Sequence, residues 1–281
     1  MNTVNKKAIK NRHILSRTRI WMQSSFLLFA FLIGLRHILP GESSRGGGFD
    51  SFCPFGGIET LWVYLTTGHT LKTTNLLNFS VLLSVLGVSL VAGRAFCGWI
   101  CPLGTIQEYL ARLAERISGG KRRIRGKRST ALLPIHLPPK VDAWLRYLKY
   151  GVLALILFTS ITAIYPPLHS LCPARAIFAF DLSTPLMWFV LIVFIATSML
   201  VERFSCKYLC PLGAVLAISN KISPMRMVID PAKCAACGRG DADCPMDIKD
   251  IPQNTRHSEC IRCLECLETC AKPGASSLQI G

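Results

Sequence analysis

The sequence predicts an all-α membrane domain of four transmembrane helices, built from an internal two-span repeat and followed by a small α+β tail. Three observations support this fold class: an apolar composition, four long apolar segments, and cysteine motifs that occur twice. The chain has 281 residues, of which 51% are hydrophobic and 17% charged. A soluble domain usually carries about 25% charged residues. The composition therefore favours a membrane protein with a small polar domain.

Four apolar segments are long enough to cross a bilayer, which takes about 20 residues of helix. The second and the fourth contain no charged residue. Four buried core helices are the alternative, but the chain has too little polar sequence to cover them in water. We therefore predict a membrane domain over residues 20–215, with repeats at about 20–110 and 145–215. The predicted spans are 20–39, 74–93, 150–167 and 182–201.

The net charge of +16 is concentrated in two places, residues 1–19 and 116–128. Basic residues near the ends of spans stay on the cytoplasmic side of a membrane. This places the basic amino terminus, the loop between spans two and three, and the tail in the cytoplasm of a bacterium, with a multi-pass chain in the inner membrane. The basic groups are expected to contact anionic lipid rather than nucleic acid. A signal peptide is the alternative for the first span, but no small-residue cleavage site follows it.

Seven cysteines lie in the predicted tail, residues 225–281, where reducing conditions favour metal binding over disulfides. Residues 260–270, "CIRCLECLETC", fit the spacing C-x2-C-x2-C-x3-C of bacterial two-cluster ferredoxins, whose fourth cysteine ligates the other cluster. We therefore predict a ferredoxin-like tail with a 4Fe-4S cluster and regard structural zinc as the weaker alternative. The ligands of that cluster are Cys244, Cys260, Cys263 and Cys266.

The other cysteine run, "CAACGRGDADCP", departs from the ferredoxin pattern because Gly240 stands where its third cysteine belongs. Crossed ligation leaves three cysteines for a second site. This site is predicted to hold a 3Fe-4S cluster, or a 4Fe-4S cluster completed by Asp241, Asp243, water or another cysteine. The three cysteines are Cys234, Cys237 and Cys270.

The remaining six cysteines belong to an internal repeat. "AFCGWICPLGTI" at 95–106 and "RFSCKYLCPLGAV" at 203–215 share C-x3-C-P-L-G at the inner end of a span. Each copy also has an outer Cys-Pro pair, at Cys53 and Cys172. For these two we leave metal ligation and disulfide formation open. A duplicated unit of this kind usually packs about a pseudo-two-fold axis.

Symmetric packing would bring the four inner cysteines together at the cytoplasmic rim. They are candidate ligands of a further, intramembrane iron–sulfur cluster, or candidate partners in thiol–disulfide chemistry. The alternative is that Cys-Pro-Leu-Gly only stops a helix. The four residues are Cys97, Cys101, Cys206 and Cys210.

With four spans, two C-x3-C-P-L-G motifs and a double ferredoxin run, the chain resembles the NapH/MauN family of ferredoxin-type membrane proteins. It is also similar to the polyferredoxin parts of NosR-type and CcoG-type proteins. The resemblance covers about residues 15–275. It implies electron transfer between quinol, cytoplasmic clusters and a redox partner on the periplasmic side.

Candidate contacts for a quinone are Trp62, Tyr64 and His69, with an interfacial aromatic belt as the alternative. Haem ligation by His37 and His169 is disfavoured, because haem usually takes paired imidazoles deep inside a helix bundle.

Two functional classes remain open from the sequence. The first is an electron-transfer subunit that resembles a quinol dehydrogenase. The second is a redox assembly factor that acts while a partner metalloenzyme matures. A transporter is disfavoured because the predicted spans lack a charged residue that would mark a substrate path.

Overall fold

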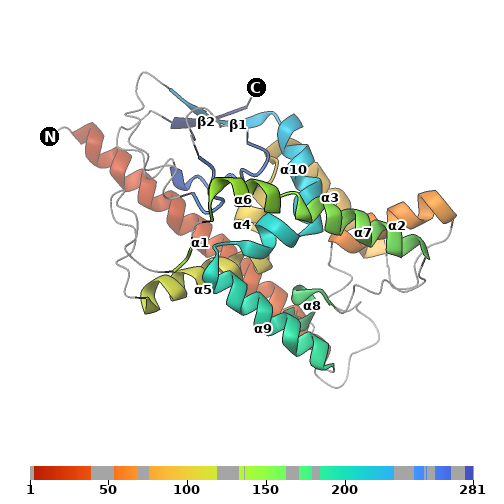
Figure 1. Cartoon of the computed structure of the whole chain (residues 1–281). Coiled ribbons are helices and arrows are strands. Elements are labelled where there is room, and N and C mark those ends of the chain that lie inside the picture. Colours follow the sequence, from red (N-terminus) through yellow and green to blue (C-terminus); the bar gives the residue numbers. More distant parts are fainter. Residues whose placement is uncertain are drawn as a thin grey trace.

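The computed structural model describes residues 3–38, 54–68, 76–118, 133–135, 137–162, 171–178, 184–230, 244–249, 251, 257–266 and 276–280. It confirms a mostly helical chain with a small sheet (Figure 1). The α-helices are α1 (Thr3–Ile38), α2 (Pro54–Thr67), α3 (Leu76–Ala92), α4 (Ala95–Trp99), α5 (Pro102–Ile117), α6 (Pro139–Leu145), α7 (Leu148–Thr162), α8 (Pro173–Phe178), α9 (Pro185–Leu200) and α10 (Pro211–Ile222). A π-helix, η3 (Ser205–Leu209), precedes α10, and the strands are β1 (Met225–Ile229) and β2 (Ser276–Ile280).

Proline and glycine set several helix boundaries. Proline stands at the first turn of α5, α9 and α10, where its missing N–H leaves no helical hydrogen bond unmade. Gly93 follows α3 with φ of 56°, the left-handed conformation that commonly ends a helix. A side chain at this position would also collide with Asn220 and Arg262. Gly93 is therefore needed for both the turn and the close approach.

The helices pack as two groups, and each group combines both copies of the repeat. In one group, α1 and α5 of the first copy contact α8 and α9 of the second. In the other, α7 and α10 of the second copy contact α2 and α3 of the first. The two groups point in different directions in Figure 1, one toward the lower part of the view and the other toward the right. Exchanging the copies converts one set of pairings into the other, as a pseudo-two-fold arrangement requires.

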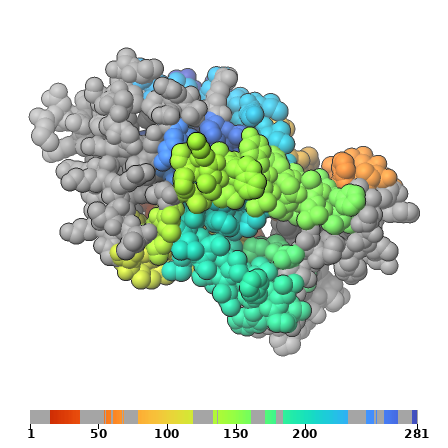
Figure 2. All heavy atoms as spheres, in the orientation of Figure 1, coloured from red at the N-terminus to blue at the C-terminus, as the bar shows by residue number. Residues whose placement is uncertain are grey.

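The structure does not confirm four spans. In the part of the chain that it describes, one segment, Leu15–Arg36, is long and apolar enough to cross a membrane. Helices α3, α7 and α9 occupy the other three predicted spans, and 17, 15 and 16 of their residues are described, where a bilayer takes roughly 20. Helix α3 begins and α7 ends at the edge of a described range. Each of the three helices exposes large apolar side chains, and both α7 and α9 lie on the face seen in Figure 2. Examples are Leu83, Phe158 and Phe189.

The tail packs directly on the inner ends of the helices. Strands β1 and β2 pair antiparallel, with Met225 opposite Ile280, and so join the start and the end of the tail. A single apolar cluster combines Val85 of α3 and Leu216 of α10 with Met246, Ile248 and Ile261 of the tail. The tail and the helices therefore share one hydrophobic core.

Candidate metal centres

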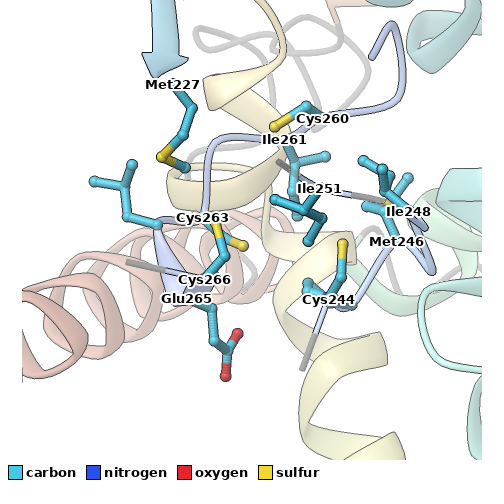
Figure 3. Close-up of a pocket in the computed structure, with 12 residues that line it drawn as sticks. Met227, Cys244, Met246, Ile248, Ile251, Cys260, Ile261, Cys263, Glu265 and Cys266 are labelled. Atoms are coloured by element: carbon cyan, nitrogen blue, oxygen red, sulfur yellow. The ribbon is translucent and has the colours of Figure 1, made fainter. Parts of the chain in front are cut away.

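Four tail cysteines line one cavity, whose other walls are mainly Met, Ile and Leu side chains (Figure 3). Arg262 and Leu264, on either side of Cys263, have φ of 50° and 62°. Left-handed backbone at non-glycine residues costs about 1–3 kcal/mol and persists where the surroundings impose it, often at a ligand site. The loop is thus wound tightly around the cavity. The four cysteines are those predicted for the first cluster, Cys244, Cys260, Cys263 and Cys266.

The chemistry of this cavity fits a 4Fe-4S cluster. Burial raises the pKa of the Cys244 thiol to about 12 and also raises the pKa of Cys260 and Cys263. Binding of iron must therefore release protons from these thiols. Among the described residues, no group of three or more His, Cys, Asp or Glu side chains is arranged to hold a single metal ion. A cluster binds each thiolate through a different iron atom, so its ligands lie farther apart than those of one ion.

Several predicted site residues lie outside the described residues. These are the three cysteines of the second tail site, Gly240 with its neighbouring aspartates, Cys53, His69 and His169. His37 falls in the last turn of α1, and its side chain is not described. The nuclearity of the second tail cluster therefore stays a prediction.

Each inner motif follows one helix and begins the next. Cys101 and Cys210 are the N-caps of α5 and α10, with φ,ψ of −61°, 113° and −71°, 113°. The proline of each motif is the next residue and begins the helix. Cys97 lies in α4 and Cys206 in η3, and both are buried. The two copies of C-x3-C-P-L-G thus have nearly the same backbone conformation at their second cysteine.

Two fully buried arginines join the copies. Arg94 and Arg203 each stand three residues before the first cysteine of their motif and are 0% exposed. Arg94 Nη2 donates to the carbonyl oxygen of Cys206 at 3.2 Å, and Arg203 Nη1 donates to that of Cys97 at 2.8 Å. Each copy therefore holds the first cysteine of the other.

The motif glycines make room for this crossing. A methyl group on Gly104 would lie 3.2 Å from Arg203 Nη1 and 3.1 Å from the Cys97 carbonyl oxygen. A methyl group on Gly213 would lie 3.0 Å from Arg94 Nη2. The glycine of C-P-L-G is thus a point of close approach for the arginine of the other copy.

We expect Gly213→Ala to destabilise the protein by about 1–3 kcal/mol, because overpacking forces buried groups apart. A methyl group on Gly87 of α3 would have no other atom within 4 Å, so Gly87→Ala should be neutral or slightly stabilising, since alanine favours helix. Thermal unfolding in detergent measures both changes. Equal melting temperatures for the two variants would contradict the close-approach assignment.

The four inner thiols lie within electrostatic range of one another. Burial raises the pKa of Cys101 well above its usual value, and charges on Cys206 and Cys97 raise it further. Burial, Cys206 and Cys97 likewise raise the pKa of Cys210 to about 12. The structure thus brings the four predicted inner cysteines together, and a metal would have to displace the protons of Cys101 and Cys210 to bind there.

A glutamine also faces these thiols. Gln107 Nε2 donates to Cys206 Sγ at 3.4 Å, and its Oε1 accepts from the backbone N–H of Ser205 at 3.0 Å.

Glu108 on α5 neutralises the arginine of the second copy. Its carboxylate accepts from Arg203 and Arg19 at 2.6 Å and from Arg112 at 2.5 Å. Burial alone would raise the pKa of Glu108, but Arg203 and Arg19 outweigh burial and lower the pKa to about 2. Arg19, counted above among the basic residues of the amino terminus, is 5% exposed. Its predicted contact with lipid is wrong, because its partner is a buried carboxylate.

The arginine of the first copy is neutralised by the tail. Arg94 Nη1 donates to Glu259 at 2.5 Å, and Lys149 of α7 donates to the same carboxylate. The residue of α10 that corresponds to Glu108 is Ala217. Glu259 of the tail therefore supplies the negative charge that the second copy lacks.

The sequence reasoning missed Arg94, Arg203, Glu108 and Glu259. A signal for the arginines was present, because each precedes its motif cysteine at the same spacing, Arg-x2-Cys. The carboxylates come from different elements and carry no such signal.

The remaining candidate residues that the structure describes are Cys172, Trp62 and Tyr64. Cys172 is the residue before α8 and is half-buried. Trp62 and Tyr64 lie on α2 and are 39% and 54% exposed, so their side chains face outward rather than into the cysteine site.

Comparison with known proteins shows the family to which the chain belongs. A family model described as a 4Fe-4S binding domain matches residues 74–125 and 183–228. Both segments contain a C-x3-C-P-L-G motif and stop before the tail cysteines. An uncharacterised protein of Methanocaldococcus jannaschii is 32% identical over 226 residues, 80% of this chain and 85% of that protein. The ferredoxin-type protein NapH of Haemophilus influenzae is 27% identical over 201 residues, 67% of this chain and 63% of NapH.

The chain belongs to the NapH/NosR-like family of ferredoxin-type proteins. Another relative, the putative electron transport protein YccM of Escherichia coli, is 28% identical over 254 residues. That match covers 84% of this chain and 64% of YccM, so the chain spans less than two thirds of that relative. No solved structure matches the chain. Membership of the NapH/NosR-like family confirms the resemblance and places the chain in a family of iron–sulfur electron-transfer proteins.

Proposed function

We propose that this NapH/NosR-like protein is a multi-pass inner-membrane carrier that passes electrons between the quinol pool, its iron–sulfur centres and a periplasmic redox protein. Four spans, cytoplasmic termini and contact with lipid are part of the proposal. The observation that carries it is the grouping of eight cysteines, four around the tail cavity and four at the crossing of the two copies. Thiolates in an apolar shell are the ligands that iron–sulfur clusters use.

The tail cavity would hold a 4Fe-4S cluster through Cys244, Cys260, Cys263 and Cys266. When bound, the cluster supplies one-electron transfer at a potential set by its surroundings. The chain surrounds it with apolar side chains and keeps Glu265 pointing away from the cysteines (Figure 3).

The inner cysteines would hold a further iron–sulfur centre at the interface of the two copies. A cluster bound by four thiolates is anionic, and Arg94 and Arg203 lie fully buried beside this site. Buried positive charge is favourable next to a buried anion. The match of the 4Fe-4S family model to both motif segments also supports this centre.

The test is reduction of the purified protein by menaquinol or ubiquinol, followed by electron paramagnetic resonance. We expect quinol to reduce the clusters. If bound quinone is absent and quinol leaves every cluster oxidised, the quinol role is wrong. The assembly-factor class would then be favoured, provided that the partner enzyme needs the chain only during its maturation.

We expect Cys263→Ser to remove the signal of the tail 4Fe-4S cluster, since a serine oxygen is a poorer iron ligand than a thiolate. The matched control is Cys172→Ser beside α8, which should retain the signal. An unchanged spectrum in Cys263→Ser would refute the assignment of this ligand.

A further inference from the structure

Gly98 and Trp99, which lie between the cysteines of the first inner motif, contact the tail loop that carries three cluster ligands. A methyl group on Gly98 would lie only 2.5 Å from the carbonyl oxygen of Ile261. Trp99 Nε1 donates to the carbonyl oxygen of Arg262 at 2.9 Å. Ile261 and Arg262 are the two residues between Cys260 and Cys263. The first motif thus touches the backbone of the cluster loop itself.

Lys207, which lies between the cysteines of the second motif, contacts the other cluster segment. Lys207 is 0% exposed, and its Nζ donates to Asp247 at 2.6 Å. Asp247 is three residues after Cys244 and donates its backbone N–H to the Cys244 carbonyl oxygen at 3.0 Å. Each of the two segments that supply ligands to the tail cavity therefore contacts one of the two inner motifs.

Further contacts fix the tail in this position. Asn220 Nδ2 of α10 donates to the carbonyl oxygens of His257, Ser258 and Cys260 at 3.0–3.1 Å. Glu259 lies between these residues and neutralises Arg94, as described above. The carboxylate is buried, so separating the tail would leave Arg94 and Lys149 without it. Removing one partner from a buried ion pair is strongly unfavourable.

Cys97 and the tail cysteines also belong to one packed cluster. Cys97 and Ile261 are both in the apolar core, and Cys244, Cys260, Cys263 and Cys266 pack against that core.

We propose that the residues between the motif cysteines are a docking cradle that holds the tail cluster against the inner centre for direct electron exchange. The main contact is Gly98 with Ile261. This inference rests on the proposed inner iron–sulfur centre. In the exchange, one electron leaves the reduced tail cluster, which is oxidised, and enters the inner centre, which is reduced. No bond breaks and no proton is needed, and the reverse transfer follows the same contact.

Gly98→Ala tests the cradle, because its methyl group must push the Ile261 backbone away. The matched control is Gly87→Ala, a helical glycine with open space around it. Iron content and the spectra of both centres are measured first, in the iron-loaded full chain reduced with dithionite. Magnetic interaction between the two reduced centres is then measured by electron paramagnetic resonance, and electron exchange by rapid-mixing kinetics.

We expect Gly98→Ala to retain iron and both signals, to weaken the magnetic interaction, and to slow exchange several-fold, because both effects fall with the distance between the centres. Trp99→Phe, which removes only the Nε1 donor, should show a smaller change in the same direction. Unchanged interaction and rate in Gly98→Ala would overturn the cradle while leaving the inner centre intact. A wild-type protein with no inner signal and no iron beyond the tail clusters would instead overturn the proposed inner centre and the inference with it.

Discussion

Glu108→Ala is expected to destabilise the folded protein by about 3–5 kcal/mol, the usual cost of leaving a buried charge without its partner. The substitution would leave two buried guanidinium groups, Arg203 and Arg19, without the carboxylate that lies 2.6 Å from each. It would also loosen the crossing of the two copies, because Arg203 holds the Cys97 carbonyl oxygen. Thermal or denaturant-induced unfolding in detergent micelles measures the loss.

Arg112→Ala is the matched control for this prediction. Arg112 contacts the same carboxylate at 2.5 Å, but its side chain is 32% exposed. Exposed ion pairs contribute about 0–1 kcal/mol, so this variant should melt close to the wild type. A similar loss in both variants would mean that burial does not set the strength of this network.

Much of the cysteine chemistry could be predicted from the sequence, because its signal is local. The spacing of Cys260, Cys263 and Cys266 identifies a ferredoxin run, and crossed ligation adds Cys244 from the earlier run. The structure places these four around one cavity. The repeat of C-x3-C-P-L-G likewise indicated that the two copies pack together, and the exchange of helices between the groups agrees with it.

The ionic contacts could not be predicted, because they depend on which elements meet in space. In a comparison of the two copies alone, the difference between Glu108 and Ala217 looks like ordinary sequence divergence. Only the fold shows that Glu259, more than forty residues later in the chain, occupies the corresponding electrostatic position. The role of Gly98 is equally hidden, since it depends on contact with Ile261 of the tail.

Helix length is the other difference. Hydropathy predicted a span over 182–201, whereas α9 covers Pro185–Leu200. Helices α3 and α7 have 17 and 15 described residues, and each meets the edge of a described range. An apolar composition indicates what surrounds a helix, but it does not fix where the helix ends. Gly93 ends α3 and Pro185 begins α9, through backbone conformation rather than hydrophobicity.

Removal of the first cysteine of either inner motif is expected to cost most of the quinol-linked reduction of the tail cluster. Cys97 and Cys206 come from different copies, and each is held by the arginine of the other copy. If both serve one centre, Cys97→Ala and Cys206→Ala should each lose most of the activity, and the double variant should lose little more. The effects of substituting residues that act as a unit do not add.

The measurements are the rate of cluster reduction by quinol and the iron content of Cys97→Ala, Cys206→Ala and the double variant, with Cys172→Ala as the control outside the centre. Loss of iron in each single variant would support a ligated cluster, whereas full iron with lost turnover would indicate thiol–disulfide chemistry. If the motifs only shaped helices, each single substitution would cost about 1 kcal/mol of stability and leave turnover unchanged. Wild-type rates and iron in all three variants would therefore rule out a redox centre at the crossing of the two copies.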